Sequence, residues 1–315
     1  MKKLTKILLA ASLLFSAAAP AMVDAQDVPR PPVWAEGELR VHDRARGELS
    51  PETQVPAQEE LMNAITTTTS ASRLQSLLEY GERVECMSCV PLLEERLLSD
   101  PDQGVREIAA WWLRRRPFAI GAVMVHMRTV LADAAETPVR RARAAEALGG
   151  LMDYHAVPHL GAAVMGDSDA TVRAAAVRGI ALINVPAGLT FLSAALADPD
   201  VSVQEAALGS ILRVNFFRDH EALMPLLGSD EDHIRRRAAS VIGSLRVAEA
   251  VPVLAAMLRG DTSESVRVQA AWALGRAGGS DARAALVEVQ TAERALGATG
   301  SQRVLDAIEI ALRMR

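Results

Sequence analysis

The chain has 315 residues and a formal net charge of −5 at pH 7, and aromatic residues make up only 3% of it. So few aromatic residues argue against an aromatic-rich β-sandwich, whereas a chain that is 50% hydrophobic and rich in Ala and Leu suits thin, closely packed helices. The mild acidic excess disfavours nucleic acid as a partner.

The N-terminus has the pattern of a signal peptide. Three lysines in the first six residues precede an apolar stretch over residues 7–19, which is too short to span a bilayer comfortably. Small-residue cleavage patterns end at Ala25, the site we favour, and at Ala21. We therefore expect residues 1–25 to be removed, leaving an exported protein, periplasmic or secreted, with no membrane insertion after cleavage.

Three further segments follow. Residues 26–57 are rich in proline and charge and lack periodicity, so we expect a disordered linker that buries too little apolar surface to fold. Residues 58–315 have helical spacing of apolar residues. They divide into a divergent N-terminal pair (58–87), regular repeats (88–280) and a C-terminal cap pair (281–315).

The regular part repeats one phrase: an Asp-containing turn, then Val or Ile, usually Arg, then two small residues and a Leu or Ile. A fixed period of this length indicates stacked two-helix units. We therefore predict an all-α fold, a right-handed α-solenoid of about seven repeats. The copies are centred on Val105, Val172, Val203, Ile234 and Val266, with a degenerate copy at Val139-Arg140; the last four regular copies are 31, 31 and 32 residues apart.

On the second helix of each unit, offsets 0, +4 and +8 from the Val or Ile fall on one face and should form the buried stripe. Asp at the turn should cap the start of this helix. Gly149, Gly243 and Gly275 stand where a glycine commonly caps a helix C-terminus.

These phrases resemble the HEAT-repeat family, in the short form called the PBS-lyase-type HEAT-like repeat. Asp198-Pro199-Asp200 and Ala270-Ala271-Trp272-Ala273-Leu274-Gly275 match its unit closely, over about residues 88–280, whereas Gln204 replaces the usual Arg. The resemblance implies an adaptor without enzymatic activity. A few members are phycobilin lyases or their partners, so a lyase-like accessory protein is an alternative.

The only two cysteines are Cys86 and Cys89. In an exported protein we expect a disulfide between them, and a redox-active pair or free thiols are the alternatives. A covalent haem site would need His rather than Val90, and a zinc site would need two more ligands.

Other chemistry is weakly supported. His155 and His159 have helical metal-pair spacing, but Pro158 should begin the helix between them. The Asp-x-Asp turns lack the Gly and the Glu of a calcium loop. No phosphate loop, nucleophile elbow or His-Glu-x-x-His motif is present, so we expect no catalytic residue, cofactor or metal.

The repeated Arg and Asp residues should form a structural ladder, in which each Arg pairs with an Asp of its own or the adjacent turn; a groove for an acidic ligand is the alternative. Such a ladder would fix the stacking register. Its members are Asp100, Arg106, Asp167, Arg173, Asp198, Asp230, Arg235, Asp261 and Arg267.

Partner binding is expected on the concave wall, which second helices line in such a superhelix. Offset +6 lies opposite the buried stripe and carries Trp111 and Trp272, with Arg114, Arg178 and Arg236 at nearby exposed offsets. Exposed aromatic and Arg side chains are favoured anchors in protein interfaces. We expect them to contact a protein or peptide, unless either Trp packs against the next repeat. A thiol-redox role of the cysteine pair is the runner-up function.

Overall fold

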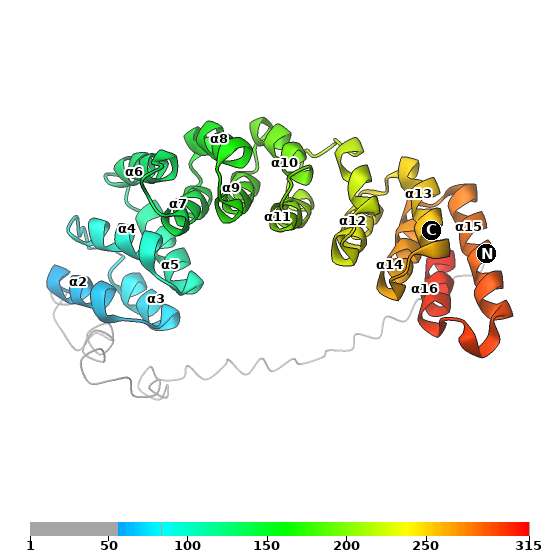
Figure 1. The fold of residues 1–315 in the computed structure, drawn as a ribbon. Coiled ribbons are helices and arrows are strands. Elements are labelled where there is room, and N and C mark those ends of the chain that lie inside the picture. Colours follow the sequence, from blue (N-terminus) through cyan, green and yellow to red (C-terminus); the bar gives the residue numbers. More distant parts are fainter. Residues whose placement is uncertain (1–55, 83, 315) are drawn as a thin grey trace, which may run out of the picture.

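The computed structural model describes residues 56–82 and 84–314, and within these ranges every regular element is a helix. The predicted signal peptide (1–25) and nearly all of the predicted linker (26–57) lie outside the described residues. The helices form two concentric layers that curve into an open arc (Figure 1). The all-α solenoid predicted from the repeats is therefore confirmed.

Helices alternate between the layers, and the described residues contain eight pairs, one more than expected. The outer layer consists of α2 (Gln58–Thr67), α4 (Cys89–Ser99), α6 (Ile120–Ala132), α8 (Val157–Gly166), α10 (Leu189–Leu196), the 3₁₀ helix η4 (Glu221–Gly228), α13 (Val251–Gly260) and α15 (Gly279–Ala295). The inner layer consists of α3 (Ala71–Tyr80), α5 (Gln103–Arg114), α7 (Pro138–Gly150), α9 (Ala170–Ile183), α11 (Val201–Ile211), α12 (Asp232–Leu245), α14 (Glu264–Ala277) and α16 (Gln302–Arg313). Short 3₁₀ turns connect some pairs: η2 (Tyr154–Ala156), η3 (Pro186–Gly188), η5 (Ala248–Ala250) and η6 (Gly297–Thr299).

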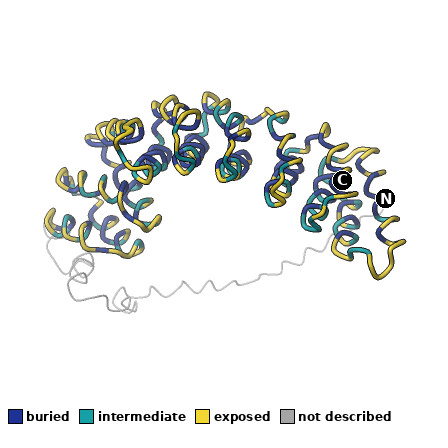
Figure 2. The backbone as a smooth tube through the Cα atoms, in the orientation of Figure 1, coloured by how far each residue is buried: buried dark blue, intermediate teal, exposed yellow. Residues whose placement is uncertain are grey.

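The core runs between the layers as one continuous band (Figure 2). The stripe predicted for inner helices is buried; on α9, for example, Val172, Ala176 and Ile180 are at most 1% exposed. Small Ala side chains in the stripe let neighbouring helices approach closely, so each pair covers the apolar face of the one before it.

Gly149, Gly243 and Gly275 do not cap helices as predicted. All three lie inside inner helices, and a Cβ at each would come within 2.8 Å of an atom in the next inner helix. Their absent side chains therefore set the distance between repeats. The left-handed backbone that ends inner helices belongs to other residues, such as Asn184 (φ 51°) and Arg246 (φ 56°).

The degenerate repeat is displaced by one residue from the predicted alignment. Val139 is 54% exposed, so it is not the buried position of α7. Arg140 stands at offset 0 instead, where it is only half-buried, and Arg141 takes the place of the repeated Arg. The turn before α7 is longer than in other repeats, Thr137 caps the helix and Pro138 is its first residue, so the sequence motif does not show this shift.

One junction differs from the rest. Between α11 and η4 the chain is irregular over residues 212–220, and the outer element η4 is a 3₁₀ helix with Pro225 inside it. Inner helices α11 and α12 stand visibly farther apart than their neighbours (Figure 1). We call this junction the seam.

Candidate functional site

The repeated Arg residues link successive repeats. Arg173 donates from Nε and Nη2 to the two carboxylate oxygens of Asp198 at 2.8 and 2.9 Å, and Arg235 does the same to Asp261 at 2.8 and 2.9 Å. Arg141 donates in the same way to Asp167 at 2.9 and 3.0 Å. Each Arg also donates to carbonyls of the turn before its own helix, so one guanidinium ties two turns together. These bidentate pairs are nearly buried, which strengthens them relative to surface ion pairs.

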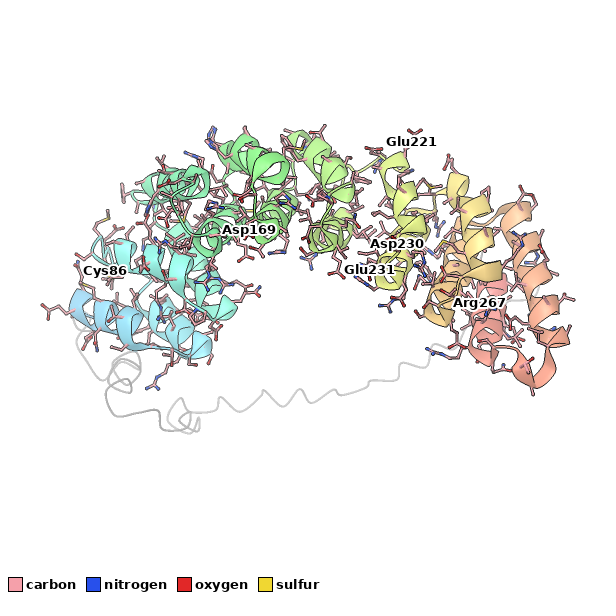
Figure 3. All side chains as sticks on the ribbon, in the orientation of Figure 1. Cys86, Asp169, Glu221, Asp230, Glu231 and Arg267 are labelled. Carbon is pink, nitrogen blue, oxygen red and sulfur yellow. A yellow bond between two sulfur atoms is a disulfide. The ribbon has the colours of Figure 1, made fainter. Side chains whose placement is uncertain are left out.

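The ends of the ladder depart from the expected pairing. Arg106 donates to the carbonyls of Asp100 and Pro101, but its carboxylate partner is Glu146 on the next inner helix. The Asp100 carboxylate pairs with Arg96 of the preceding helix. At the other end Arg267 pairs with the buried Glu293 of α15, because the cap pair has no Asp turn at that point (Figure 3).

The seam lacks this link entirely. Gln204 stands where Arg173 and Arg235 stand in their repeats, and it reaches only the carbonyl of Asp198. Ser229 occupies the place of the ladder Asp, where it accepts a hydrogen bond from the backbone N–H of Glu231. Asp230, predicted as a ladder residue, is one position away: its carbonyl accepts from Arg235, and its exposed side chain lies at the start of α12 (Figure 3).

The Asp residues of the turns act as helix caps. Asp102 accepts from the backbone N–H groups of Gly104 and Val105, and Asp169 accepts from the N–H and hydroxyl of Thr171. The Thr171 hydroxyl lowers the pKa of Asp169. Capping accounts for these carboxylates without a metal.

The remaining metal candidates lie apart. His155 is in η2 and His159 is in α8, and both are exposed. Within the described ranges no group of three or more His, Cys, Asp and Glu residues is placed to hold a metal ion. Across the same ranges, no helix has the length and hydropathy to span a bilayer.

Cys86 and Cys89 are joined in a disulfide at the start of α4 (Figure 3). Cys86 is 2% exposed and Cys89 is fully buried, and both pack in the continuous core. The bridge therefore fixes the turn that leads into α4.

The concave face carries a hollow of about 400 Å³ over inner helices α5, α7, α9 and α11, which we call the first hollow. Half-buried Trp111 lies in it, under the guanidinium of Arg115, which is 4.5 Å from the ring centre. Its charged lining consists of Arg106, Arg114, Arg143, Arg178, Arg213, Glu107 and Glu146. Five cations against two carboxylates give the lining a formal charge of +3, in a chain whose net charge is −5.

Three of these arginines lack a carboxylate partner within residues 56–82 and 84–314. Glu146 serves both Arg106 and Arg178, at 3.5 and 3.0 Å. Arg114 and Arg143 donate only to backbone carbonyls, and Arg213 has no hydrogen-bond or ion-pair partner among the described residues. Burial, and then the positive charge of Arg106, lower the pKa of Arg143. The first hollow thus holds positive charge that an anion would stabilise.

A second hollow of about 400 Å³ lies across the seam, between α11 and α12 and reaching α14. Arg236 lines it beside Arg237, while His233 pairs there with Glu205 at 3.2 Å. Neither Arg236 nor Arg237 has a hydrogen-bond or ion-pair partner in the described part of the chain. Among the predicted contact residues, Trp111, Arg114 and Arg178 therefore lie together, and Arg236 lies in this separate hollow.

Trp272 lines neither hollow. A Cβ on Gly243 would meet the Trp272 ring at 2.6 Å, so the ring covers this glycine of the neighbouring helix α12. Its contact is between repeats, and Trp272 is not placed as an anchor for a partner in either hollow.

Comparison with known proteins agrees with this architecture. The sequence profile described as HEAT repeats matches residues 126–211 and 220–295, about half of the chain. The chain belongs to the HEAT-repeat family. The gap between the two matched ranges, residues 212–219, lies within the irregular segment of the seam.

The chain is also similar to solved structures, and with the first of them it shares the overall fold. The Escherichia coli protein YibA is 16% identical, with a TM-score of 0.52 over 91% of this chain and 100% of YibA. Human deoxyhypusine hydroxylase in complex with glycerol is 20% identical (82% and 96% covered, TM-score 0.34). The complex of CpcE and CpcF of phycocyanin lyase from Nostoc is 16% identical (84% and 96% covered, TM-score 0.33). No curated protein sequence matches the chain.

Sequence reasoning missed Arg143 and Arg213 as lining residues of this HEAT-repeat groove. Arg143 stands at offset +3 of α7, on the same face as offset +6, and Arg213 stands at offset +10, two residues beyond the end of α11. Applying the helical period to every inner helix would have found them. Offset alone does not show which arginines lack a carboxylate partner, because that depends on neighbouring repeats.

Proposed function

We propose that this HEAT-repeat protein is a non-catalytic scaffold that holds an acidic segment of a protein partner on its concave face. The observation that carries the proposal is the first hollow, where Trp111 lies among Arg114, Arg143 and Arg213, none of which has a carboxylate partner. Arg guanidinium groups bind carboxylates with paired hydrogen bonds, and a half-buried Trp adds apolar area. Carboxylates from a partner would satisfy the unpaired cations.

The test is titration of the full protein with a fluorescein-labelled hexaglutamate peptide. Arg114→Glu and Arg213→Glu should each weaken binding about tenfold, since each removes a charge-assisted contact and adds repulsion. Arg313→Glu is the matched control, because it makes the same charge change outside both hollows. Equal weakening by all three variants, or none by the first two, would contradict the proposal.

The thiol-redox alternative receives little support. Exchange requires a thiolate to reach a disulfide sulfur, and both cysteines are buried in the core. We therefore assign the bridge a structural role. A reduction potential well below that of catalytic disulfides is the expected measurement.

We also propose that the protein works outside the cytoplasm. A structural disulfide suits an oxidising compartment, and the N-terminal segment has the pattern of a signal peptide. N-terminal sequencing of the protein from its native cell should give Gln26 as the first residue. An intact Met1 would contradict this proposal and would not affect the proposed binding of a partner in the first hollow.

A further inference from the structure

The inner face of α11 has an exceptional glycine. Offset +6 carries Trp111, Glu146, Arg178, Ser240 and Trp272 in other inner helices, but Gly209 in α11. Two other glycines within inner helices are required by packing: a Cβ on Gly149 or Gly179 would come 2.7 Å from backbone atoms of the adjacent helix. Gly150, at the end of α7 and in the first hollow, would meet only Ala110 Cβ, at 3.6 Å. A Cβ on Gly209 would meet only Arg237 Nη2, at 3.6 Å, an ordinary contact.

Packing in the fold therefore does not explain this glycine. Gly inside a helix is less stabilising than Ala, and Gly is favoured where a ligand approaches the backbone closely. Gly209 lies between the two hollows: the first is lined by Ser210 of α11 and by Arg213 just after it, and the second by Glu205 of α11 and Arg237 of α12. At Gly209, α11 therefore presents only backbone to the concave face between the two hollows.

We infer that a single extended acidic segment occupies both hollows and crosses α11 over the backbone of Gly209. This inference rests on the proposed function and specifies its ligand. Arginines without a partner among the described residues lie on both sides of Gly209: Arg213 lines the first hollow, and Arg237 and Arg236 line the second. A side chain at position 209 would stand in the path between them.

The geometry sets the length of the ligand. Adjacent helices pack about 8–10 Å apart and the seam is wider, so the five steps from α5 to α14 cover at least about 40–50 Å. An extended chain advances about 3.3–3.6 Å per residue, so a segment of about 12–15 residues reaches from one hollow to the other. A six-residue peptide can fill only one.

The charges favour an acidic polypeptide over a nucleic acid. Glu107 and Glu146 line the first hollow and Glu205 lines the second. A continuous phosphate backbone would meet these carboxylates, whereas a polypeptide can place neutral or basic residues opposite them. An acidic chain as a whole also repels nucleic acid.

The experiment compares labelled hexaglutamate and a 16-residue polyglutamate on the full protein. The longer peptide should bind more than tenfold tighter, because its second contact is intramolecular. Gly209→Leu should bring the affinity for the longer peptide down toward that for hexaglutamate and leave hexaglutamate binding unchanged. Gly209→Ala, which adds only a Cβ, should weaken the longer peptide less than Gly209→Leu does. Gly121→Leu makes the same change on outer helix α6, where a Cβ meets nothing within 4 Å, and as the matched control it should change neither affinity. Thermal unfolding of each variant checks that the fold is retained.

The outcomes separate the two proposals. Hexaglutamate binding with no effect of Gly209→Leu on the longer peptide overturns the crossing and leaves the proposed function standing. Absence of binding by both peptides overturns both. A 16-nucleotide oligothymidylate that binds more tightly than polyglutamate overturns the choice of an acidic polypeptide. If Gly209→Leu lowers the unfolding midpoint, Arg237→Gln replaces it, and an unchanged affinity for the longer peptide then rejects the crossing.

Discussion

Arg173 and Asp198 face each other across two adjacent repeats, joined by two parallel hydrogen bonds at 2.8 and 2.9 Å, with the Arg and Asp side chains 14% and 7% exposed. Removing one partner of such a pair leaves the other charge buried. We expect Arg173→Gln alone to lower the free energy of unfolding by about 2–4 kcal/mol. The double variant Arg173→Gln/Asp198→Ser should be less destabilised than the sum of the single variants. Additive losses in a urea double-mutant cycle would show that the pair does not couple the repeats.

The missing link at the seam can be supplied. Gln204→Arg with Ser229→Asp reproduces the pair found at the neighbouring junctions, and we expect the double variant to gain about 1–2 kcal/mol in unfolding free energy. Neither single variant should gain as much, since each adds a partly buried charge without its partner. Chemical denaturation of the three variants measures this. A double variant less stable than the parent would mean that the repeats at the seam stand too far apart to pair.

Asp261 makes stability depend on pH. Hydrogen bonds from Arg235 lower the pKa of Asp261 in the folded protein below its unfolded value of about 3.9. Between the two values the unfolded chain binds more protons, so this contribution is full above pH 4 and is lost as pH falls through the folded pKa. Asp261→Asn should therefore destabilise the protein more at pH 7 than at pH 3. Equal losses in urea titrations at the two pH values would contradict this.

The disulfide should contribute little to stability because it closes a very short loop. For four residues the loop-entropy estimate is about 2 kcal/mol, and we expect Cys86→Ala/Cys89→Ala to lose about 1–2 kcal/mol. The parent should lose a similar amount in reductant. The double variant is its own control, since the chain has no other cysteine and reductant should leave it unchanged.

Replacing each of two inner-helix glycines with Ala should change the free energy of unfolding differently. A Cβ at Gly179 would lie 2.7 Å from the Ala145 carbonyl oxygen, so Gly179→Ala forces α7 and α9 apart and should cost about 1–3 kcal/mol. Gly209→Ala meets no such obstacle and should leave stability unchanged or raise it by up to about 1 kcal/mol. Thermal unfolding midpoints of the two variants decide this, and a similar loss in both would show that α11 is packed as tightly as α9.

The repeat period was sufficient to predict the layers, the buried stripe and the capping turns, because all three depend on local spacing. The predictions for Val139 and Asp230 were each wrong by one residue. At Val139 the preceding turn is longer, and at Asp230 the ladder Asp is replaced by Ser229. In both places the motif alone did not show which residue occupies each position of the repeat. Close approach at Gly149 could not be predicted, since it depends on a residue of the next repeat. Trp111 lies in the first hollow and Trp272 lines neither hollow, although both share one offset, because their neighbours in adjacent repeats differ.

The seam also affects how the arc responds to force. When its two ends are pulled, every junction carries the same load, and the junction with the fewest cross-links lengthens first. Between α11 and α12 there is no Arg–carboxylate pair of the kind that joins α9 to the following turn. Stretching or bending of the scaffold should therefore change its curvature mainly at this point, deforming the second hollow, which lies across the seam, while the first hollow keeps its shape.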